Sequence, residues 1–298
     1  MDAGRLLHAG VLTHRERTAF MKWNVVTDSS CDLIPSDYRS DAIELSSVPF
    51  AISVGVRGYT DGEQLDIQEM LRDMEQEKTA SYTSCPAPGA WLEQFEKADR
   101  TIAITISSQL SGSMNSALTA RDLALEADPD KKIAVLDSRS TGPELVLCVR
   151  EIERLAREGI GFDEAVDRVN AFLDKTKVIF ALSSFDNLIK NGRMHKMAGF
   201  LAKALGMWGI GSASDEGRIV VEGKTRGPKR TVRALIECMR ERGFSGGNVA
   251  ISHCDNHAVA HALKDGILNA WADSQIEILP TRGLCSYYAE RGGLIVGF

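Results

Sequence analysis

Short runs of β-branched and other apolar residues recur along the chain. Between them lie longer stretches in which apolar residues repeat every three or four positions, as at 145–155 and 162–172. The short runs predict strands, and the periodic stretches predict helices. The predicted strands lie at 23–26, 101–106, 133–136, 178–182, 218–221, 248–251 and 276–279. Alternation of strands and helices predicts an α/β protein with largely parallel sheets and helices on both faces.

The chain is long enough for two such units, because 298 residues exceed the usual size of one α/β core. A long helical pair ends near 173–177, where a new strand begins, and we place the domain boundary there. We predict an N-terminal α/β domain at 21–175 and a C-terminal α/β domain at 176–298, each with a mostly parallel sheet flanked by helices. Residues 1–20 are expected to form a flexible extension.

Composition and charge narrow the class of partner. The formal net charge of −6 argues against nucleic acid or an anionic membrane as the main partner, since either would favour a basic surface. The six cysteines are scattered, with no Cys-x-x-Cys pair, which is typical of free thiols in a reducing compartment. No apolar run approaches the roughly 18 residues of a spanning helix. We therefore expect a cytoplasmic protein without stable membrane insertion.

Hydroxyl-rich loops follow several predicted strands. Ligands of open parallel sheets bind beyond the carboxyl ends of the strands, so these loops are the first place to look for a site. A buried carboxylate needs hydrogen bonds that replace its water, and hydroxyl groups with the free N–H groups at a helix start supply them without a metal ion. The loops lie at 27–32, 81–86, 107–113 and 137–142.

Two of these loops carry the best candidates for binding an anion. Ser108, Ser111 and Gly112 stand where a strand gives way to a helix, and Thr83 and Ser84 lie on a loop that we expect to face them. The alternative is that these residues only cap helices and form turns, which is their most common role.

The first hydroxyl-rich loop favours a structural role more strongly. Thr27, Asp28 and Ser29 directly follow the first predicted strand. An Asp followed by two serines is typical of a turn in which the carboxylate accepts N–H groups of its own loop. We predict that this segment ties the first loop and does not contact the ligand.

The sequence also permits chemistry of its own. A serine hydrolase would need a turn such as Gly-x-Ser-x-Gly, which is missing from this sequence. His253, His257 and His261 lie close together beside Cys254 and Asp255, and such side chains could bind zinc in a metal-assisted enzyme. Their spacing matches no firm zinc signature. We predict neither a metal ion nor a catalytic residue, and the metal-assisted enzyme stays as an alternative.

The ordered series of loops resembles the DegV family. Thr83-Ser84-Cys85-Pro86 is similar to the family's Thr-Ser-Gln-Pro, and residues 107–113 correspond to its Ser-Ser-x-Leu-Ser-Gly-Thr/Ser motif. Other matching segments lie at 27–33, 48–50, 59–62, 137–138, 188–193, 215–217 and 224–226. The matches run in order from about residue 22 to the C-terminus, so the resemblance covers nearly the whole chain.

The resemblance implies a two-domain DegV-like fold with a long-chain fatty acid bound between the domains and no other cofactor. It points to Thr83, Ser108 and Ser111 as ligands of the carboxylate. Family members present the acid to a separate fatty acid kinase that makes acyl-phosphate for phospholipid synthesis. Arg193 and Arg226 would lie near that partner or the head group. The neighbouring residues Ser84, Ser107 and Gly112 complete the expected carboxylate site.

One position departs from the family pattern. The family usually has a histidine before the turn that leads into the last strand, and Tyr288 stands there in this chain. A tyrosine donates a hydrogen bond to a carboxylate but carries no positive charge. We include Tyr288 in the expected carboxylate site. A regulatory protein that has lost lipid binding is a further alternative.

A fatty-acid site also needs an apolar tunnel. Burial of a 16-carbon chain gains on the order of 12 kcal/mol before the costs of ordering it. Bulky apolar residues gather between two predicted strands of the C-terminal half, and the alternative is that they form ordinary core. The tunnel candidates are Phe200, Leu201, Leu205, Met207, Trp208 and Ile210.

Overall fold

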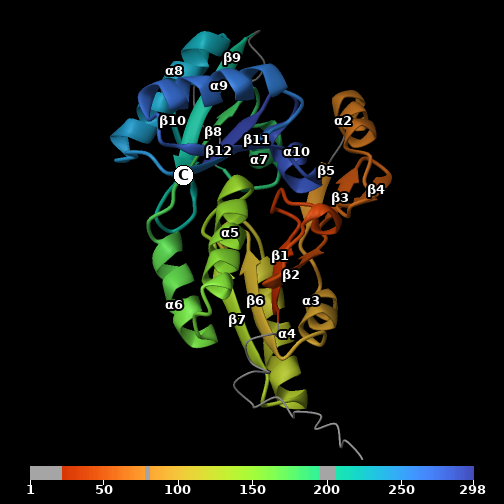
Figure 1. Cartoon of the computed structure of the whole chain (residues 1–298). Helices are drawn as coiled ribbons and strands as arrows, with labels where there is room; N and C mark the ends of the chain where they lie inside the picture. Colours follow the sequence, from red (N-terminus) through yellow and green to blue (C-terminus); the bar gives the residue numbers. More distant parts are fainter. Residues whose placement is uncertain (1–21, 78–80, 195–205) are drawn as a thin grey trace, which may run out of the picture.

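The computed structural model describes residues 22–77, 81–194 and 206–298. Within them the chain forms three sheets, shown in Figure 1. Each of the seven predicted strand runs overlaps a strand, and the two periodic stretches lie in α5 and α6. The α/β class is therefore confirmed. The predicted extension at 1–20 lies outside the described residues, and the domain limits at 175 and 176 stay a prediction.

The N-terminal half is built on a four-stranded parallel sheet in the order β2-β1-β6-β7. Adjacent residues on its strands point to opposite faces. Val25 and Ile102 pack under α5 and α6, whereas Val26 and Ala103 pack under α3 and α4. The elements are β1 (Trp23–Asp28), η1 (Pro35–Asp37), β2 (Ile43–Val48), α3 (Pro88–Phe95), β6 (Arg100–Thr105), α4 (Ser113–Ala127), β7 (Lys132–Asp137), α5 (Pro143–Arg157) and α6 (Phe162–Leu173).

A small antiparallel sheet, in the order β4-β3-β5, branches from this half and was not predicted. Its strands are only four residues long, so their sequence pattern is weak. Ile52 and Val54 pack against Met70 of α2 and Tyr287 of α10. The elements are β3 (Ala51–Val54), β4 (Arg57–Thr60), α2 (Ile67–Gln76) and β5 (Ser81–Ser84).

The C-terminal half forms a six-stranded sheet in the order β10-β9-β8-β13-β11-β12. Its elements are β8 (Val178–Leu182), α7 (Asp186–Lys190), β9 (Met207–Ala213), β10 (Ile219–Arg226), α8 (Pro228–Glu241), β11 (Asn248–His253), α9 (His257–Ala270), β12 (Gln275–Pro280), α10 (Gly283–Ala289) and β13 (Leu294–Gly297). No helix in the described ranges is long and apolar enough to cross a membrane.

The expectation of a mostly parallel sheet is wrong for this C-terminal half. Only β11 and β12 pair in parallel, and the other four pairings are antiparallel. β9 and β10 form a hairpin closed by a hydrogen bond from Ser214 N to Arg218 O, and a connection that short joins only antiparallel strands. The last strand, β13, inserts between β8 and β11, where it runs antiparallel to both.

The first loop has the structural role that its sequence predicts. The buried Asp28 accepts hydrogen bonds from the N–H and hydroxyl groups of Ser30 at 3.2 and 2.5 Å. Its second oxygen accepts from Ile106 N and Ser113 Oγ at 2.9 and 2.6 Å. Burial raises the pKa of Asp28, and these hydrogen bonds oppose that shift. Asp28 therefore fixes the loop after β6 against the loop after β1.

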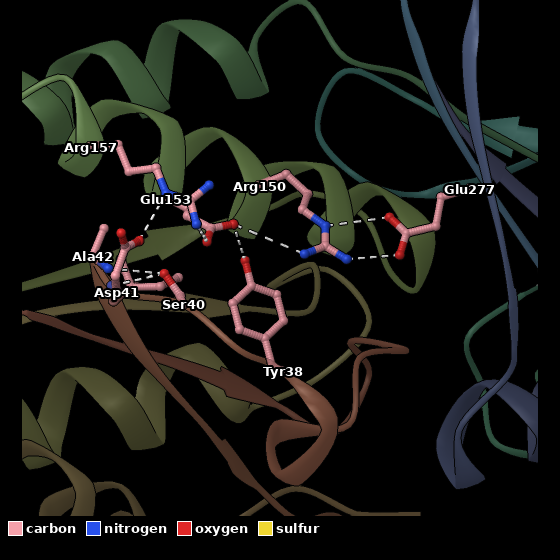
Figure 2. Close-up of polar contacts among 9 residues, drawn as sticks. Tyr38, Ser40, Asp41, Ala42, Arg150, Glu153, Arg157 and Glu277 are labelled. Carbon is pink, nitrogen blue, oxygen red and sulfur yellow. Dashed lines mark hydrogen bonds and ion pairs between the residues drawn. The ribbon is translucent and has the colours of Figure 1, made fainter.

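A polar network joins the two halves along α5 (Figure 2). Arg150 forms a two-pronged ion pair with Glu277 of β12 at 2.8 and 3.3 Å, and its guanidinium lies 4.8 Å from the centre of the Tyr38 ring. The Tyr38 hydroxyl donates to Glu153 at 2.6 Å, and Glu153 also pairs with Arg157 at 2.9 Å. α5 thus contacts β12 of the six-stranded sheet on one side and Tyr38, which follows η1, on the other.

Candidate functional site

A pocket lies between the six-stranded sheet and the loops of the N-terminal half. It has about 800 Å³ of space between atoms, part of it open to solvent. Its walls come from β8, β10, β13, α7 and α10, and from the loops that follow β6 and β7. The pocket therefore lies beyond the carboxyl ends of parallel strands, where the sequence analysis expected a ligand.

One wall of the pocket is apolar. Val178, Phe180 and Leu182 occupy alternate positions of β8, so they point to the same face of the sheet. Ile295 pairs with Phe180 on the neighbouring strand and extends this face. Opposite Phe180 on β9 stands Gly211, where a Cβ would lie 2.5 Å from the ring. This glycine lets the Phe180 ring lie flat across the sheet.

Hydroxyl groups and one cation gather at another part of the pocket. Thr83 of β5, Ser111 of the loop after β6 and Tyr288 of α10 all line it, together with Arg193. The Thr83 and Tyr288 hydroxyls lie 2.8 Å apart and share a hydrogen bond. We call Thr83, Ser111, Arg193 and Tyr288 the polar end of the pocket.

Tyr288 is a neutral donor at this polar end. Burial raises the pKa of its phenol, while the hydrogen bond to Thr83 and the positive charge of Arg193 lower it. The net shift is upward, so the phenol keeps its proton at neutral pH. A protonated phenol beside a hydroxyl can donate to an anion, while Arg193 supplies the positive charge that a tyrosine lacks.

The backbone holds the Arg193 guanidinium in place. Its Nε donates to Leu110 O at 3.1 Å, and its Nη1 donates to Asn191 O. In the described part of the chain, no carboxylate lies within ion-pair distance of it. Arg193 is half-buried and lines the pocket. A half-buried guanidinium without a counter-ion favours binding of a carboxylate, with which it forms strong, charge-assisted hydrogen bonds.

The other predicted carboxylate ligands lie around this end without facing the pocket. Ser107 is buried and donates from Oγ to Gly217 O at 2.8 Å, which ties its loop to the β9–β10 hairpin. Ser108 is exposed, and its N–H donates to Asp137. Ser84 and Gly112 are also exposed, and Gly112 caps the start of α4.

The described tunnel candidates lie away from the pocket wall. Trp208 and Ile210 pack with Leu235 of α8 and Val259 of α9, on the opposite face of the sheet. Met207 begins β9 and pairs with Arg226 at the end of β10. Phe200, Leu201 and Leu205 lie outside the described residues. Arg226 is exposed and does not contribute to the polar end.

The three histidines form a surface row. His257 and His261 have their Nε2 atoms 3.0 Å apart, and the rings of His253 and His257 are 5.6 Å apart. Asp255 instead pairs with Arg291, and burial raises the pKa of Cys254 to about 11. Across the described residues, no group of three or more His, Cys, Asp or Glu side chains is arranged to hold a metal ion.

Sequence reasoning missed most of the pocket wall, including Leu110, Ile219 and Leu284. The available signal was the run at 178–182, which was read as a strand without a decision on which side faces a ligand. Asn191 was also missed. Its side-chain amide donates a hydrogen bond to the Tyr287 hydroxyl at 3.0 Å and so supports α10 beside Arg193.

Comparison with known proteins agrees with this fold. A family model described as an uncharacterised protein of the DegV family matches residues 22–298. A DegV domain-containing protein of Streptococcus pyogenes serotype M1 is 40% identical over 278 residues, which cover 93% of this chain and 99% of that protein.

Solved structures are similar over the same length. The fatty acid kinase B3 protein of Streptococcus pneumoniae, loaded with linoleic acid, is 37% identical with a TM-score of 0.90, covering 93% of this chain and 99% of that one. A DegV family protein from Eubacterium eligens, loaded with heptadecanoic acid, is 37% identical with a TM-score of 0.88, covering 92% and 98%. With the family model matched from residue 22 to the last residue, this chain belongs to the DegV family.

Proposed function

We propose that this protein is a carrier that buries one long-chain fatty acid in the pocket and presents its carboxylate to a fatty acid kinase subunit. The observation that carries the proposal is the combination of one apolar wall, centred on Phe180, with a polar end that holds Arg193 and a pair of hydrogen-bonded hydroxyls. A fatty acid has the same division between an apolar chain and an anionic head.

The acyl chain would lie along the wall formed by β8 and β13. Each buried methylene contributes about 0.8 kcal/mol, which gives on the order of 12 kcal/mol for a 16-carbon chain before the cost of ordering it. This gain is sufficient for tight carriage without a covalent bond. We assign the chain to Val178, Phe180, Leu182 and Ile295 in place of Trp208 and Ile210, which pack under the helices.

The carboxylate would lie at the polar end. Thr83, Ser111 and Tyr288 would donate hydrogen bonds, and Arg193 would balance the charge. Ser107 would act indirectly by tying its loop to Gly217, while Ser84, Ser108 and Gly112 would border the opening. Such a site binds an anion without activating it, so we propose that the protein carries the fatty acid and a partner performs the chemistry.

The related structures support both the ligand and the partner. Two of them hold linoleic and heptadecanoic acid, and one of these is a protein of a fatty acid kinase. We place the carrier in the cytoplasm, which agrees with its six free cysteines. Arg193 would lie where the kinase meets the head group, and Arg226, exposed at the end of β10, would lie on the same partner surface.

The test is the content of the purified protein. Native mass spectrometry and lipid extraction should find one C14–C18 fatty acid per chain, removable and replaceable by oleate. The Arg193→Gln variant should bind oleate about tenfold or more weakly, because the carboxylate loses its charge-assisted partner. Arg240→Gln is the control, since Arg240 is exposed and contacts Glu237 and the Trp271 ring, neither of which lines the pocket.

Two outcomes would contradict the proposal. Bound zinc together with turnover of a substrate would favour the metal-assisted enzyme and the histidine row. A protein that is empty when purified and ignores added oleate would favour a regulatory protein that has lost lipid binding. Presentation to the kinase is tested separately, by acyl-phosphate formation when the loaded carrier is mixed with a fatty acid kinase subunit.

A further inference from the structure

Helix α10 carries part of the pocket wall and the hydroxyl of its polar end. Leu284, Cys285 and Tyr288 all line the pocket. Figure 1 shows α10 between the six-stranded sheet and the small antiparallel sheet, where the two halves of the molecule meet. The helix has only seven residues, so its own backbone hydrogen bonds fix it weakly. Its position must depend on contacts with its surroundings.

Two buried carboxylates of the N-terminal half hold the start of this helix. Asp32 Oδ1 accepts the N–H of Arg282 at 2.8 Å. Asp61 Oδ1 accepts the N–H of Gly283 at 2.8 Å, and its Oδ2 accepts the N–H of Leu284 at 2.7 Å. Both aspartates are 2% exposed. Three consecutive N–H groups of the C-terminal half therefore donate hydrogen bonds to carboxylates from the loops after β1 and β4.

Gly283 leaves room for the Asp61 carboxylate because it has no side chain. A Cβ at Gly283 would lie 2.4 Å from Asp61 Oδ1 and 2.4 Å from Leu65 Cδ2. Any larger residue would push the carboxylate away from the N–H groups. The side chain of Arg282 donates a further hydrogen bond to Gly62 O at 2.7 Å. The turn before α10 is therefore held by Asp61 and by the residue that follows it.

Holding the helix this way has a cost. Burial raises the pKa of Asp32 and the pKa of Asp61 to about 6, which means that the folded protein penalises the ionised carboxylates. An asparagine at position 61 would avoid the charge, but its NH2 group only donates, so one of the two N–H groups would lose its acceptor. Asp61 thus provides two acceptor oxygens, which a neutral side chain of the same size does not.

We propose that Asp32 and Asp61 are positioning residues for the fatty acid: by holding residues 282–284 they set where Tyr288 stands relative to Thr83. The inference rests on the proposed function, since its consequence is a change in fatty-acid affinity. Neither aspartate lines the pocket, so each would act only through α10.

The direct test compares Asp61→Asn with Glu153→Gln. Glu153 is also a buried carboxylate, but it pairs with Tyr38 and Arg157 on the far side of α5. In the fatty-acid-free protein, hydrogen–deuterium exchange of residues 282–289 should accelerate at least about fivefold in Asp61→Asn and stay unchanged in Glu153→Gln. Oleate affinity should fall about tenfold in the first variant and less than about twofold in the second.

The pH profile separates positioning from a general loss of stability. Burial raises the pKa of Asp61, whereas the N–H groups of Gly283 and Leu284 lower it. Loosening of α10 withdraws these N–H groups from a carboxyl that stays buried, so the loosened state has the higher pKa and protonation favours it. α10 should therefore loosen in the natural protein below pH 6. Its oleate affinity should therefore fall as the pH drops from 7.5 to 5, more steeply than in Asp61→Asn; titration of oleate itself affects both equally. The charged and titratable groups that face the two carboxylates are Arg282, Cys285 and Cys31, and Asp32 and Asp61 also face each other.

Two further results keep the outcome decisive. Gly283→Ala retains both carboxylates and should reproduce the faster exchange by displacing Asp61. If either variant fails to fold, the exchange of residues 282–289 in the natural protein, corrected for intrinsic rates, should still rise below pH 6. Exchange and affinity that match Glu153→Gln would overturn the positioning role. Failure of the natural protein to bind oleate would overturn the proposed function alone, because the exchange experiment needs no ligand.

Discussion

One face of the six-stranded sheet is sealed by helices α8 and α9, whereas the other face lines the pocket. Both faces are built from the same strands. On β8, Ile179 and Ala181 pack under the helices with Leu235 and Leu263. The alternate residues Val178, Phe180 and Leu182 point into the pocket. The neighbouring strand β13 shows the same division between the two faces. Its Val296 pairs with Ile179 and belongs to the same helix-covered core.

The difference shows that burial alone does not identify a binding residue. Ile179 and Leu182 are both buried apolar side chains on one strand. The first has permanent neighbours from two helices, so its contacts contribute to folding. The second contributes to the wall of a space that a ligand can fill, so part of its apolar surface gains contacts only on binding. The same substitution on the two faces should therefore have different effects.

The largest effect is expected on the helix-covered face. Ile179→Gln would bury an amide without hydrogen-bond partners and leave apolar space, so the free energy of unfolding should fall by about 3 kcal/mol or more. Urea unfolding of the fatty-acid-free protein measures this change. Oleate affinity of the folded fraction should change less than about twofold. A large loss of affinity at equal stability would mean that the two faces are not independent.

A smaller effect, on binding, is expected on the pocket face. Leu182→Gln replaces a side chain of similar size with a polar one that water can reach in the empty pocket but an acyl chain cannot satisfy. Oleate affinity should fall about tenfold or more, measured by titration calorimetry. The free energy of unfolding should change by less than in Ile179→Gln. Equal destabilisation by the two variants would contradict the assignment of Leu182 to the ligand.

The same two faces explain how far the sequence could lead. The run at 178–182 predicts a strand because it is short, apolar and β-branched. It is apolar at every position, so no alternation distinguishes the side that faces helices from the side that faces a ligand. Trp208 and Ile210 were assigned to a tunnel because they are bulky and apolar, although β9 directs them under α8. The antiparallel insertion of β13 depends on partners far away in the chain, which local pattern does not encode.

At the polar end, sequence reasoning located the loops but did not separate neighbouring hydroxyls. Thr83 and Ser84 are adjacent on β5 and point to opposite sides, so one is buried at the pocket and the other is exposed. Tyr288 was expected there from its place in the family pattern, and the structure places its hydroxyl beside Thr83. Arg193 was expected only in the vicinity of the head group or partner, because Leu110 O, one of the two backbone acceptors that hold its guanidinium, is distant in sequence.

The smallest effect should separate two serines of one loop. Ser111 lines the pocket, and its Oγ accepts the N–H of Ser113 at 3.2 Å. Ser108 is exposed and holds its loop through its backbone N–H, which donates to Asp137. Ser111→Ala should weaken oleate binding about threefold to tenfold, since a hydroxyl donor contributes about 1 kcal/mol and three other donors, including Arg193, still hold the carboxylate. Ser108→Ala should leave the affinity within about twofold, because its contact to Asp137 survives the loss of the hydroxyl.

Equal losses in both variants would place the carboxylate at the rim of the pocket, outside the polar end. A loss in neither would leave Thr83, Tyr288 and Arg193 as the whole head-group site.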